Sequence, residues 1–419
     1  MRVQKRMRGV DRRSFIKLSS GAVIAVGANW FLPKISLGAE PEILIGGLCE
    51  LSGPASNMGT EQAKAMELAV EMYNQKGGIL GRKVKLIMED TESKKDVGLA
   101  KARRLVERSK VHYLAGIIFS SISMAVQQYI REKRVLFVNS GSGNDALIQP
   151  PYCDRYFFKA PGSFRLTCLA IREPAKKYSK WYFLGDDYSW GKGCIEFFKK
   201  SIELVRPNYE NVGEVYPPFG ETNYAPYLTK VMAANPEALA IANFGAGWPR
   251  AIMQARQMGL KCHIHHQFWD LNNARATGDA VIGITSSSEF LNENPKAPRA
   301  KMFTDAYKEK YGDFPGSLAA YGFHTIEVIL EAVKAAKTTD TEAVVDTMES
   351  MVYKDSIMSP DYHFRKADHQ PITGLYSIEA IADPKYKYGT KILHYDPKPT
   401  VLVVPENQTG CETYMKKRS

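Results

Sequence analysis

The sequence predicts an α/β protein made of two doubly wound α/β lobes, joined by crossover strands around a central cleft. Short apolar runs rich in β-branched and aromatic residues alternate with amphipathic segments of helical length, the pattern of parallel strands separated by helices. The alternation stops at Pro150-Pro151 and then restarts with a second series of the same kind. The length of 419 residues also exceeds what one hydrophobic core normally supports.

The first series predicts a β-α-β-α-β-α-β arrangement. Thr60 is expected to cap the first helix, with Glu61 near its positive end, and the glycines of 74–81 to close it. The expected strands are 42–49, 84–88, 111–119 and 135–139, and the later helices are 96–108 and 121–134.

Two neighbouring strands of this series end in small hydroxyl and glycine residues. The third strand is followed by Ser120 and Ser121, and the fourth by Ser142 and Gly143. In an open parallel sheet, ligands bind beyond the carboxyl ends of the strands, and hydroxyls with free amides there suit a carboxylate. Small hydroxyls also cap helices, which is the competing explanation. Two such loops on adjacent strands favour a ligand site.

The second series predicts another sheet of the same architecture, entered through a crossover at 160–162. A strand expected at 155–159 leads into this crossover; the strands expected after it are 181–185, 212–216, 238–242 and 261–266, and the helices are 164–178, 192–205, 224–234 and 249–258. The last third carries an expected strand at 280–284, helices at 300–311, 317–338 and 342–349, and β-rich sequence over 353–404.

Helices that follow the second sheet suggest that the chain returns to the first lobe. The sequence also predicts a signal segment at 1–39 and a tail at 406–419. Lobe 1 is expected to comprise 42–160 and about 287–360, and lobe 2 to comprise 161–286 and about 361–405.

The net charge of +11 is concentrated at the N-terminus and does not indicate a nucleic-acid partner. Residues 1–39 contain eight Lys or Arg and one acid, so the remaining chain carries only +4. That charge, spread over a long body, is not the footprint of a nucleic-acid-binding face.

The N-terminus predicts export. The stretch from Asp11 to Lys17 contains Arg12-Arg13 and resembles the twin-arginine export motif, and a moderately apolar run follows to Leu32. Cleavage after Gly38 satisfies the small-x-small rule, and the run is short for a membrane-spanning helix. The expected location is the periplasm, reached by the twin-arginine pathway.

Six cysteines leave fifteen pairings open, and the sequence does not choose among them. They are widely spaced, without a C-x-x-C motif. Twin-arginine cargo folds where thiols stay reduced, so buried core cysteines with at most one late disulfide are expected.

The order and spacing of several stretches resemble the leucine/isoleucine/valine-binding protein family, the type I periplasmic solute-binding proteins of ABC transporters. The likeness covers about 42–400. Its stretches are 42–59, 76–82, 89–91, 119–121, 140–143, 186–191, 245–249, 254–259, 311–315 and 320–321. Family members have two α/β lobes joined by three crossovers, which close around a ligand.

The resemblance implies a carboxylate site on the first lobe. Ser120, together with Ser121, matches the family serine that binds the ligand carboxylate. Ser142 and Gly143 match the residues that complete this site, although Gly143 stands where the family has a threonine.

The resemblance also implies walls around the rest of the ligand. Met58 stands at the mouth, Trp190 at the second-lobe wall and Tyr321 near a first-lobe aromatic position. Asp270 falls near the family acid that pairs with an amino group. If Asp270 has that role the ligand is an α-amino acid, and otherwise a carboxylate, amide or aromatic acid fits better. Trp248, at the tip of a second-lobe loop, either contacts ligand or covers the core.

A histidine-rich strand allows a metal alternative. His263 and His265 lie two residues apart and share one face of the predicted strand. A metal site needs three or four converging ligands, so hydrogen-bonded or solvated histidines are the simpler interpretation.

Enzymatic motifs are absent from the sequence. Gly141-Ser142-Gly143 lacks the third glycine of a dinucleotide fingerprint, and neither a phosphate-binding P-loop nor a G-x-S-x-G elbow occurs. We therefore expect neither enzyme activity nor a cofactor.

The sequence predicts an extracytoplasmic solute-binding protein of an ABC importer. It would act as a monomer that captures a branched-chain or other amino acid, or a small carboxylate, by hinge closure and delivers it to an inner-membrane permease. The alternatives are a ligand-binding sensor for amides, urea or aromatic acids, and an exported metal-binding protein that uses His263 and His265.

Overall fold

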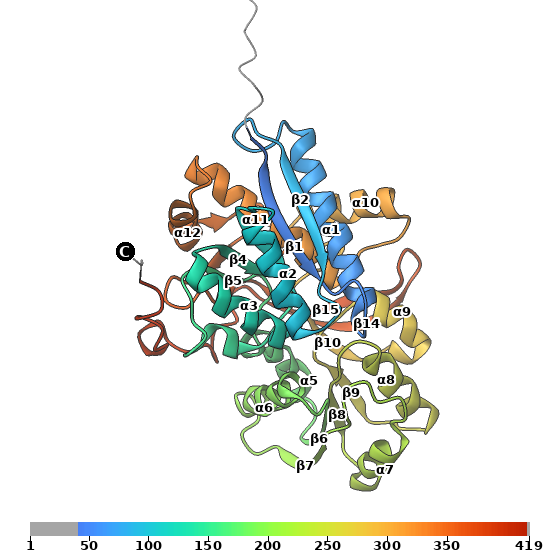
Figure 1. Ribbon diagram of the computed structural model, residues 1–419. Coiled ribbons are helices and arrows are strands. Elements are labelled where there is room, and N and C mark those ends of the chain that lie inside the picture. The colour runs from blue at the N-terminus through green and yellow to red at the C-terminus, as the bar shows by residue number, and fades with distance from the viewer. Residues whose placement is uncertain (1–40, 417–419) are drawn as a thin grey trace, which may run out of the picture. The chain divides into compact units, whose positions relative to one another are not determined.

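Two large sheets, one of five strands and one of seven, organise the computed structural model, which describes residues 41–416 (Figure 1). The predicted two-lobe α/β fold is confirmed. The predicted signal segment at 1–39 lies outside the described residues. None of the helices within 41–416 is long and apolar enough to cross a membrane.

The first sheet is parallel throughout and has the order β2-β1-β3-β4-β5. β3 and β4 are buried along their whole length, which is why their sequences read as continuous apolar runs. The strands are β1 (Ile43–Cys49), β2 (Val84–Asp90), β3 (Tyr113–Gly116), β4 (Leu136–Asn139) and β5 (Phe157–Lys159), and their connecting helices are α1 (Ser56–Gln75), α2 (Lys95–Glu107) and α3 (Ser120–Lys133).

The chain returns to the first lobe after the second sheet, as the sequence suggested. α11 (Ser317–Ala336) packs along α1 and is buried over most of its length. α10 (Arg299–Tyr311), α12 (Thr341–Ser350) and the small sheet of β11 (Val352–Tyr353), β12 (Tyr362–Phe364) and β13 (Pro371–Ile372) contribute to the same core.

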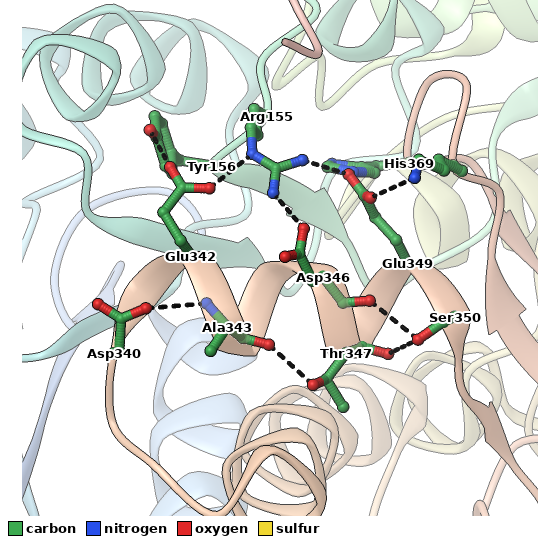
Figure 2. Close-up of polar contacts among 11 residues, drawn as sticks. Arg155, Tyr156, Asp340, Glu342, Ala343, Asp346, Thr347, Glu349, Ser350 and His369 are labelled. Carbon is green, nitrogen blue, oxygen red and sulfur yellow. Dashed lines mark hydrogen bonds and ion pairs between the residues drawn. The ribbon is translucent and has the colours of Figure 1, made fainter. Parts of the chain in front are cut away.

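α12 is fixed to the first lobe by a buried guanidinium (Figure 2). The side chain of Arg155, 4% exposed, forms ion pairs with Glu342, Asp346 and Glu349 at 2.9, 2.5 and 2.9 Å. His369 adds a contact to Glu349 at 3.2 Å. Paired in this way, the buried charge positions the helix without an uncompensated desolvation cost.

The second sheet has the order β15-β14-β10-β9-β8-β6-β7, and β14 pairs antiparallel with both of its neighbours. Its strands are β6 (Lys180–Gly185), β7 (Glu210–Val215), β8 (Ala238–Ala242), β9 (His263–His266), β10 (Thr285–Ser288), β14 (Leu375–Asp383) and β15 (Lys387–Asp396). Its helices include α6 (Ser189–Glu203), α7 (Ala225–Ala234), α8 (Gly247–Gln257) and α9 (Leu271–Thr277).

Three segments carry the chain between the two lobes within the described residues. The first follows β5, the second follows β10, and the third joins β13 to β14. Tyr362 and Phe364 pack with the first core, whereas Leu375 begins a strand of the second sheet. The predicted lobe boundaries stay a proposal.

The first helix begins earlier than predicted. α1 starts at Ser56, so Thr60 lies inside the helix and does not cap it. The early start lets Gly59 pack against the backbone of Glu50, where an added Cβ would lie 2.1 Å from the carbonyl oxygen. Tertiary packing therefore overrides the capping signal.

The predicted helix 164–178 is interrupted. It consists of α4 (Phe164–Thr167), a 3-10 turn (Cys168–Ile171) and α5 (Arg172–Ala175). Pro174 has no N–H to donate to the carbonyl of Ala170, and that carbonyl accepts from the Ser377 hydroxyl instead.

The predicted strand 280–284 is wrong. Those residues overlap a 3-10 turn (Gly278–Val281), and β10 follows at Thr285–Ser288. The sequence of β10 is TSSS, which has no apolar run to signal a strand, yet it is buried between β9 and β14.

Candidate functional site

A cavity of about 40 Å³ lies between the carboxyl ends of the two sheets. Its first-lobe side includes Gly141, Gly143 and Tyr321, and its second-lobe side includes Trp190, Phe244 and Phe268. A volume of this size holds a few water molecules, so a bound organic solute requires the two walls to move apart.

A polar pair of serines from the loops after β3 and β4 lies next to Gly141 and Gly143 on the first-lobe side of the cavity, although neither serine is among its lining residues. The hydroxyl groups of Ser120 and Ser142 lie 2.6 Å apart. The buried amide of Asn139 connects the loops, because its Nδ2 donates to the Ile117 carbonyl at 2.8 Å and its Oδ1 accepts from the Ser142 amide at 2.9 Å. Gly141 allows the close approach, since an added Cβ would lie 2.8 Å from the Cα of Ile118.

A buried carboxylate holds the loop after β3. Glu50, at the end of β1, accepts hydrogen bonds from the amides of Ile118 (3.1 Å) and Phe119 (3.2 Å). Burial raises the pKa of Glu50 to about 7. Ile117, the residue before Ile118, has a φ of 69°, a strained value for a β-branched residue. These contacts fix Ser120 at the first position of α3.

The second-lobe wall is aromatic and is centred on Trp190, at the start of α6. Its ring contacts Phe164, Phe244 and Phe268, at centroid distances of 6.3, 5.5 and 6.4 Å. Gln267, beside Phe268, also lines the cavity and donates to the Thr167 hydroxyl at 2.8 Å. This wall offers an apolar ring-lined surface to a ligand.

A second buried carboxylate holds this wall. Asp186, at the end of β6, accepts from the Phe244 amide at 2.8 Å and from the Asn243 side-chain amide at 2.5 Å. Burial raises the pKa of Asp186 to about 6. The contact places Phe244 beside Trp190.

Glu289 is the acid among the residues that line the cavity. Its carboxylate accepts from the Tyr321 hydroxyl at 2.7 Å and from the Gly162 amide at 2.9 Å. Burial raises the pKa of Glu289 to about 7, and the positive charge of Lys159 opposes that rise. Sequence reasoning missed Glu289 because it follows β10, the strand with no apolar signal.

The structure brings together Gly143, Trp190 and Tyr321, which line the cavity, and places the Ser120–Ser142 pair beside them. It places the remaining predicted residues elsewhere. Ser121 is exposed, Met58 packs in the first core, Trp248 is fully buried, and Asp270 is buried against the start of α11.

Asp270 and Trp248 have structural partners. The Asp270 carboxylate caps α9 through the Asn273 amide (3.0 Å) and accepts from the Ser317 amide (3.0 Å). Trp248 stacks on His266 at a centroid distance of 4.4 Å. Neither side chain lines the cavity.

His263 and His265 share a face, as predicted, and both contact the Thr285 hydroxyl, at 2.8 and 2.9 Å. Burial lowers the pKa of both, that of His263 to about 4. Among the described residues no cluster of three or more His, Cys, Asp or Glu side chains could hold a metal ion. The two histidines therefore share Thr285 as a hydrogen-bonding partner.

Comparison with known proteins points to one family. The family described as periplasmic binding protein matches residues 42–385. The Leu/Ile/Val-binding protein homolog 1 of Brucella abortus (strain 2308) is 23% identical over 394 residues, covering 89% of this chain and 98% of the relative.

Solved structures share the fold. The substrate-binding protein LivJ of Streptococcus pneumoniae, solved in complex with isoleucine, has a TM-score of 0.74 and 22% identity, and the match covers 85% of this chain and 99% of LivJ. A solute-binding protein of an ABC transporter from Rhodopseudomonas palustris BisB5, solved in complex with 3,4-dihydroxy benzoic acid, has a TM-score of 0.77 and 20% identity, with 85% and 98% covered.

Proposed function

Because the chain belongs to the periplasmic binding protein family, we propose that it captures a small carboxylate with an apolar, ring-sized body for an ABC importer. Membership of the family implies an extracytoplasmic solute-binding role. The chemical class of the ligand is the further step, and the asymmetry of the two cavity walls supports it.

The first-lobe wall suits the carboxylate. The hydroxyls of Ser120 and Ser142 lie together at the ends of two adjacent strands, with glycine amides beside them. Hydrogen bonds to an ionised acceptor contribute about 1.5–3 kcal/mol each. These donors are held by Glu50 and Asn139 before a ligand arrives, so little ordering entropy remains to be lost on binding.

The second-lobe wall suits an apolar body. Trp190, Phe244 and Phe268 present three rings to the cavity. A flat ring of the ligand between them would bury apolar area and make stacked or edge-to-face contacts with these rings. Asp270, the predicted partner of an amino group, is not among the residues that line the cavity, and its carboxylate already accepts from the amides of Asn273 and Ser317. The neighbour solved with 3,4-dihydroxy benzoic acid has the same fold, and its ligand has this chemistry.

Closure of the two lobes completes the proposed mechanism. A ligand that contacts both walls stabilises the closed arrangement, which the permease would recognise. The small cavity means that the walls must separate for binding and close again afterwards. No covalent step is part of the proposal.

A branched-chain amino acid is the second candidate, and Glu289 favours it. Its carboxylate lines the cavity and would face a ligand ammonium. That carboxylate already accepts from Tyr321 and Gly162, and its raised pKa reduces its charge near neutral pH. We therefore rank the amino acid below the simple carboxylate.

Export by the twin-arginine pathway and delivery to an inner-membrane permease complete the proposal. The Arg12-Arg13 motif supports the export route. A sensor role would use the same cavity and closure. In a strain that lacks the permease genes, ligand uptake is lost if the protein serves transport and is unchanged if it serves only as a sensor.

A thermal-shift screen tests the ligand class directly. Purified protein is heated with aromatic carboxylates, aliphatic carboxylates, branched-chain amino acids, amides, urea and zinc. We expect aromatic carboxylates to raise the unfolding midpoint, because a ligand that binds only the folded state stabilises it. Stabilisation by leucine or isoleucine alone selects the second candidate, and stabilisation by zinc alone refutes both.

A further inference from the structure

The C-terminal segment 397–416, here called the C-terminal strap, contacts both lobes. After β15 the chain leaves the second sheet and ends beside the first lobe (Figure 1). The strap contains only a short 3-10 turn (Glu406–Gln408), so its position depends on side-chain and carbonyl contacts.

One end of the strap is attached to the second lobe. The side chain of Leu402 packs with Leu169, Ala170 and Leu375, which belong to the 3-10 turn after α4 and to β14. The carbonyl of Leu402 accepts from the guanidinium of Arg165 at 3.3 Å. Both contacts are non-covalent and hold the strap against the second sheet.

The other end is covalently bonded to the first lobe. Cys411 forms a disulfide with Cys153, 258 residues earlier in the sequence, and both cysteines are fully buried. Tyr414 lies against the guanidinium of Arg131 on α3, at 5.4 Å. Four other cysteines of the described residues are free, so this is the disulfide among the pairings that the sequence left open.

Between its two ends the strap covers a polar seam where the lobes meet. Arg165 of the second lobe lies 3.8 Å from Asp145 of the first. A space of about 20 Å³ beside this pair is lined by Val404 and Thr409 of the strap. Arg365, in the turn between β12 and β13, donates to the Val404 carbonyl at 2.7 Å.

We propose that the C-terminal strap, locked by the Cys153–Cys411 disulfide, is a fourth connection between the lobes that favours their closed arrangement. The three chain crossings act as hinges, and the strap adds a link whose two ends lie on different lobes. Opening moves the second-lobe anchor at Leu402 relative to the first-lobe anchor at Cys411, so contacts that hold the strap along the seam, such as that between Arg365 and the Val404 carbonyl, must break. The proposal depends on the two-lobe architecture and not on the ligand.

The disulfide sets how strongly the strap acts. Eight residues lie between Leu402 and Cys411, and the nine residue steps from one to the other reach roughly 30 Å when extended, so the bond alone does not prevent opening. It keeps the docking segment close to its site, which raises the effective concentration of Leu402 there. The strap therefore favours closure only once the two cysteines are oxidised, as they would be after export.

Small-angle X-ray scattering of the ligand-free protein tests the proposal. The first variant ends at Asp396 and carries Cys153→Ser. We expect its radius of gyration to increase although the chain is shorter, so a loose tail cannot explain the change. Light scattering confirms that it is monomeric, and circular dichroism confirms that it is folded.

Leu402→Ala keeps the disulfide and tests the strap if the truncated protein fails to fold. It should shift the profile in the same direction by a smaller amount. Cys262→Ser, which removes a free cysteine away from the strap, should leave the profile unchanged. Profiles of the folded variants that superimpose on that of the parent protein would overturn the proposal.

Discussion

The two lobes hold their ligand-facing loops with the same device. Glu50 in the first lobe and Asp186 in the second each directly follow a strand, and the carboxylate of each accepts hydrogen bonds from amides of a neighbouring loop. In each lobe a glycine of the following helix packs against the backbone of that acidic residue. An added Cβ would lie 2.1 Å from the backbone carbonyl oxygen of Glu50 at Gly59, and 2.2 Å from that of Asp186 at Gly191.

The difference lies in the residue before each glycine. Met58 precedes Gly59 and packs in the first core, whereas Trp190 precedes Gly191 and lines the cavity. The first lobe therefore presents backbone and hydroxyl groups, and the second presents rings. The comparison teaches that one scaffold can carry opposite chemistry on its two walls, which divides recognition into an anionic part and an apolar part.

Removing the ring at the centre of the aromatic wall should have the largest effect. Trp190→Ala leaves a gap among three rings, so we expect a loss of about 3–5 kcal/mol in unfolding free energy. Affinity for an aromatic carboxylate should fall by at least about 100-fold. Denaturant unfolding and calorimetric titration measure the two effects.

Trp190→Phe and Trp248→Phe form a matched pair that separates binding from folding. Trp248 is fully buried against His266, so its change should lower stability and leave affinity intact. Equal losses of affinity in both variants would contradict the assignment of the aromatic wall.

Removing the hydroxyl pair should have the second largest effect. Ser120→Ala with Ser142→Ala removes two donors to the carboxylate, so affinity should fall about 10- to 100-fold with little change in stability. Ser121→Ala is the control, because Ser121 is exposed in the same helix turn. A double variant that binds the ligand as tightly as this control would contradict the assignment of Ser120 and Ser142 to the ligand site.

The sequence predicted the architecture well and the site in part. The hydroxyl loops were visible because apolar strands precede them. The carboxylates of Glu50 and Asp186 that hold these loops were not predicted. Glu50 stands nine residues before its glycine and Asp186 only five, so the two lobes show no repeated motif in the sequence. Glu289 depends on a strand of TSSS, and Asp270 lies in a loop whose direction only packing decides.

The pH dependence of binding separates the two ligand classes. Glu289 has a pKa of about 7, so it gains negative charge as the pH rises from 6 to 8. A carboxylate ligand should then bind more weakly, by at most about tenfold per pH unit, and an amino acid more tightly. Calorimetric titration over this range gives the sign of the change in affinity with pH, and Glu289→Gln should remove most of that pH dependence.

The same raised pKa affects stability with a defined sign. The folded protein holds the proton of Glu289 more tightly than the unfolded chain, whose carboxyl has the usual pKa of 4.5. The stability from this group is therefore present below pH 4.5 and is lost as the pH rises through about 7. A pH profile of Glu289→Gln that matches the parent profile would show that this group does not control either property.

Changing Asp270, which does not line the cavity, should have the smallest effect on binding. Asp270→Ala removes the cap of α9, so we expect a loss of about 0.5–2 kcal/mol in unfolding free energy. Affinity for an aromatic carboxylate should fall by less than about tenfold, because loss of the Asp270–Ser317 contact weakens closure but leaves both cavity walls intact. A loss of affinity without a loss of stability would return Asp270 to the ligand site.

The most direct test compares a ring-bearing acid with its neutral analogue on the unmodified protein. Calorimetric titration with benzoate and with benzamide changes only the group that faces the Ser120–Ser142 wall. The two-wall account predicts that benzoate binds and that benzamide binds at least about tenfold more weakly. Equal affinity for the two compounds, or binding of isoleucine with no binding of benzoate, would contradict it.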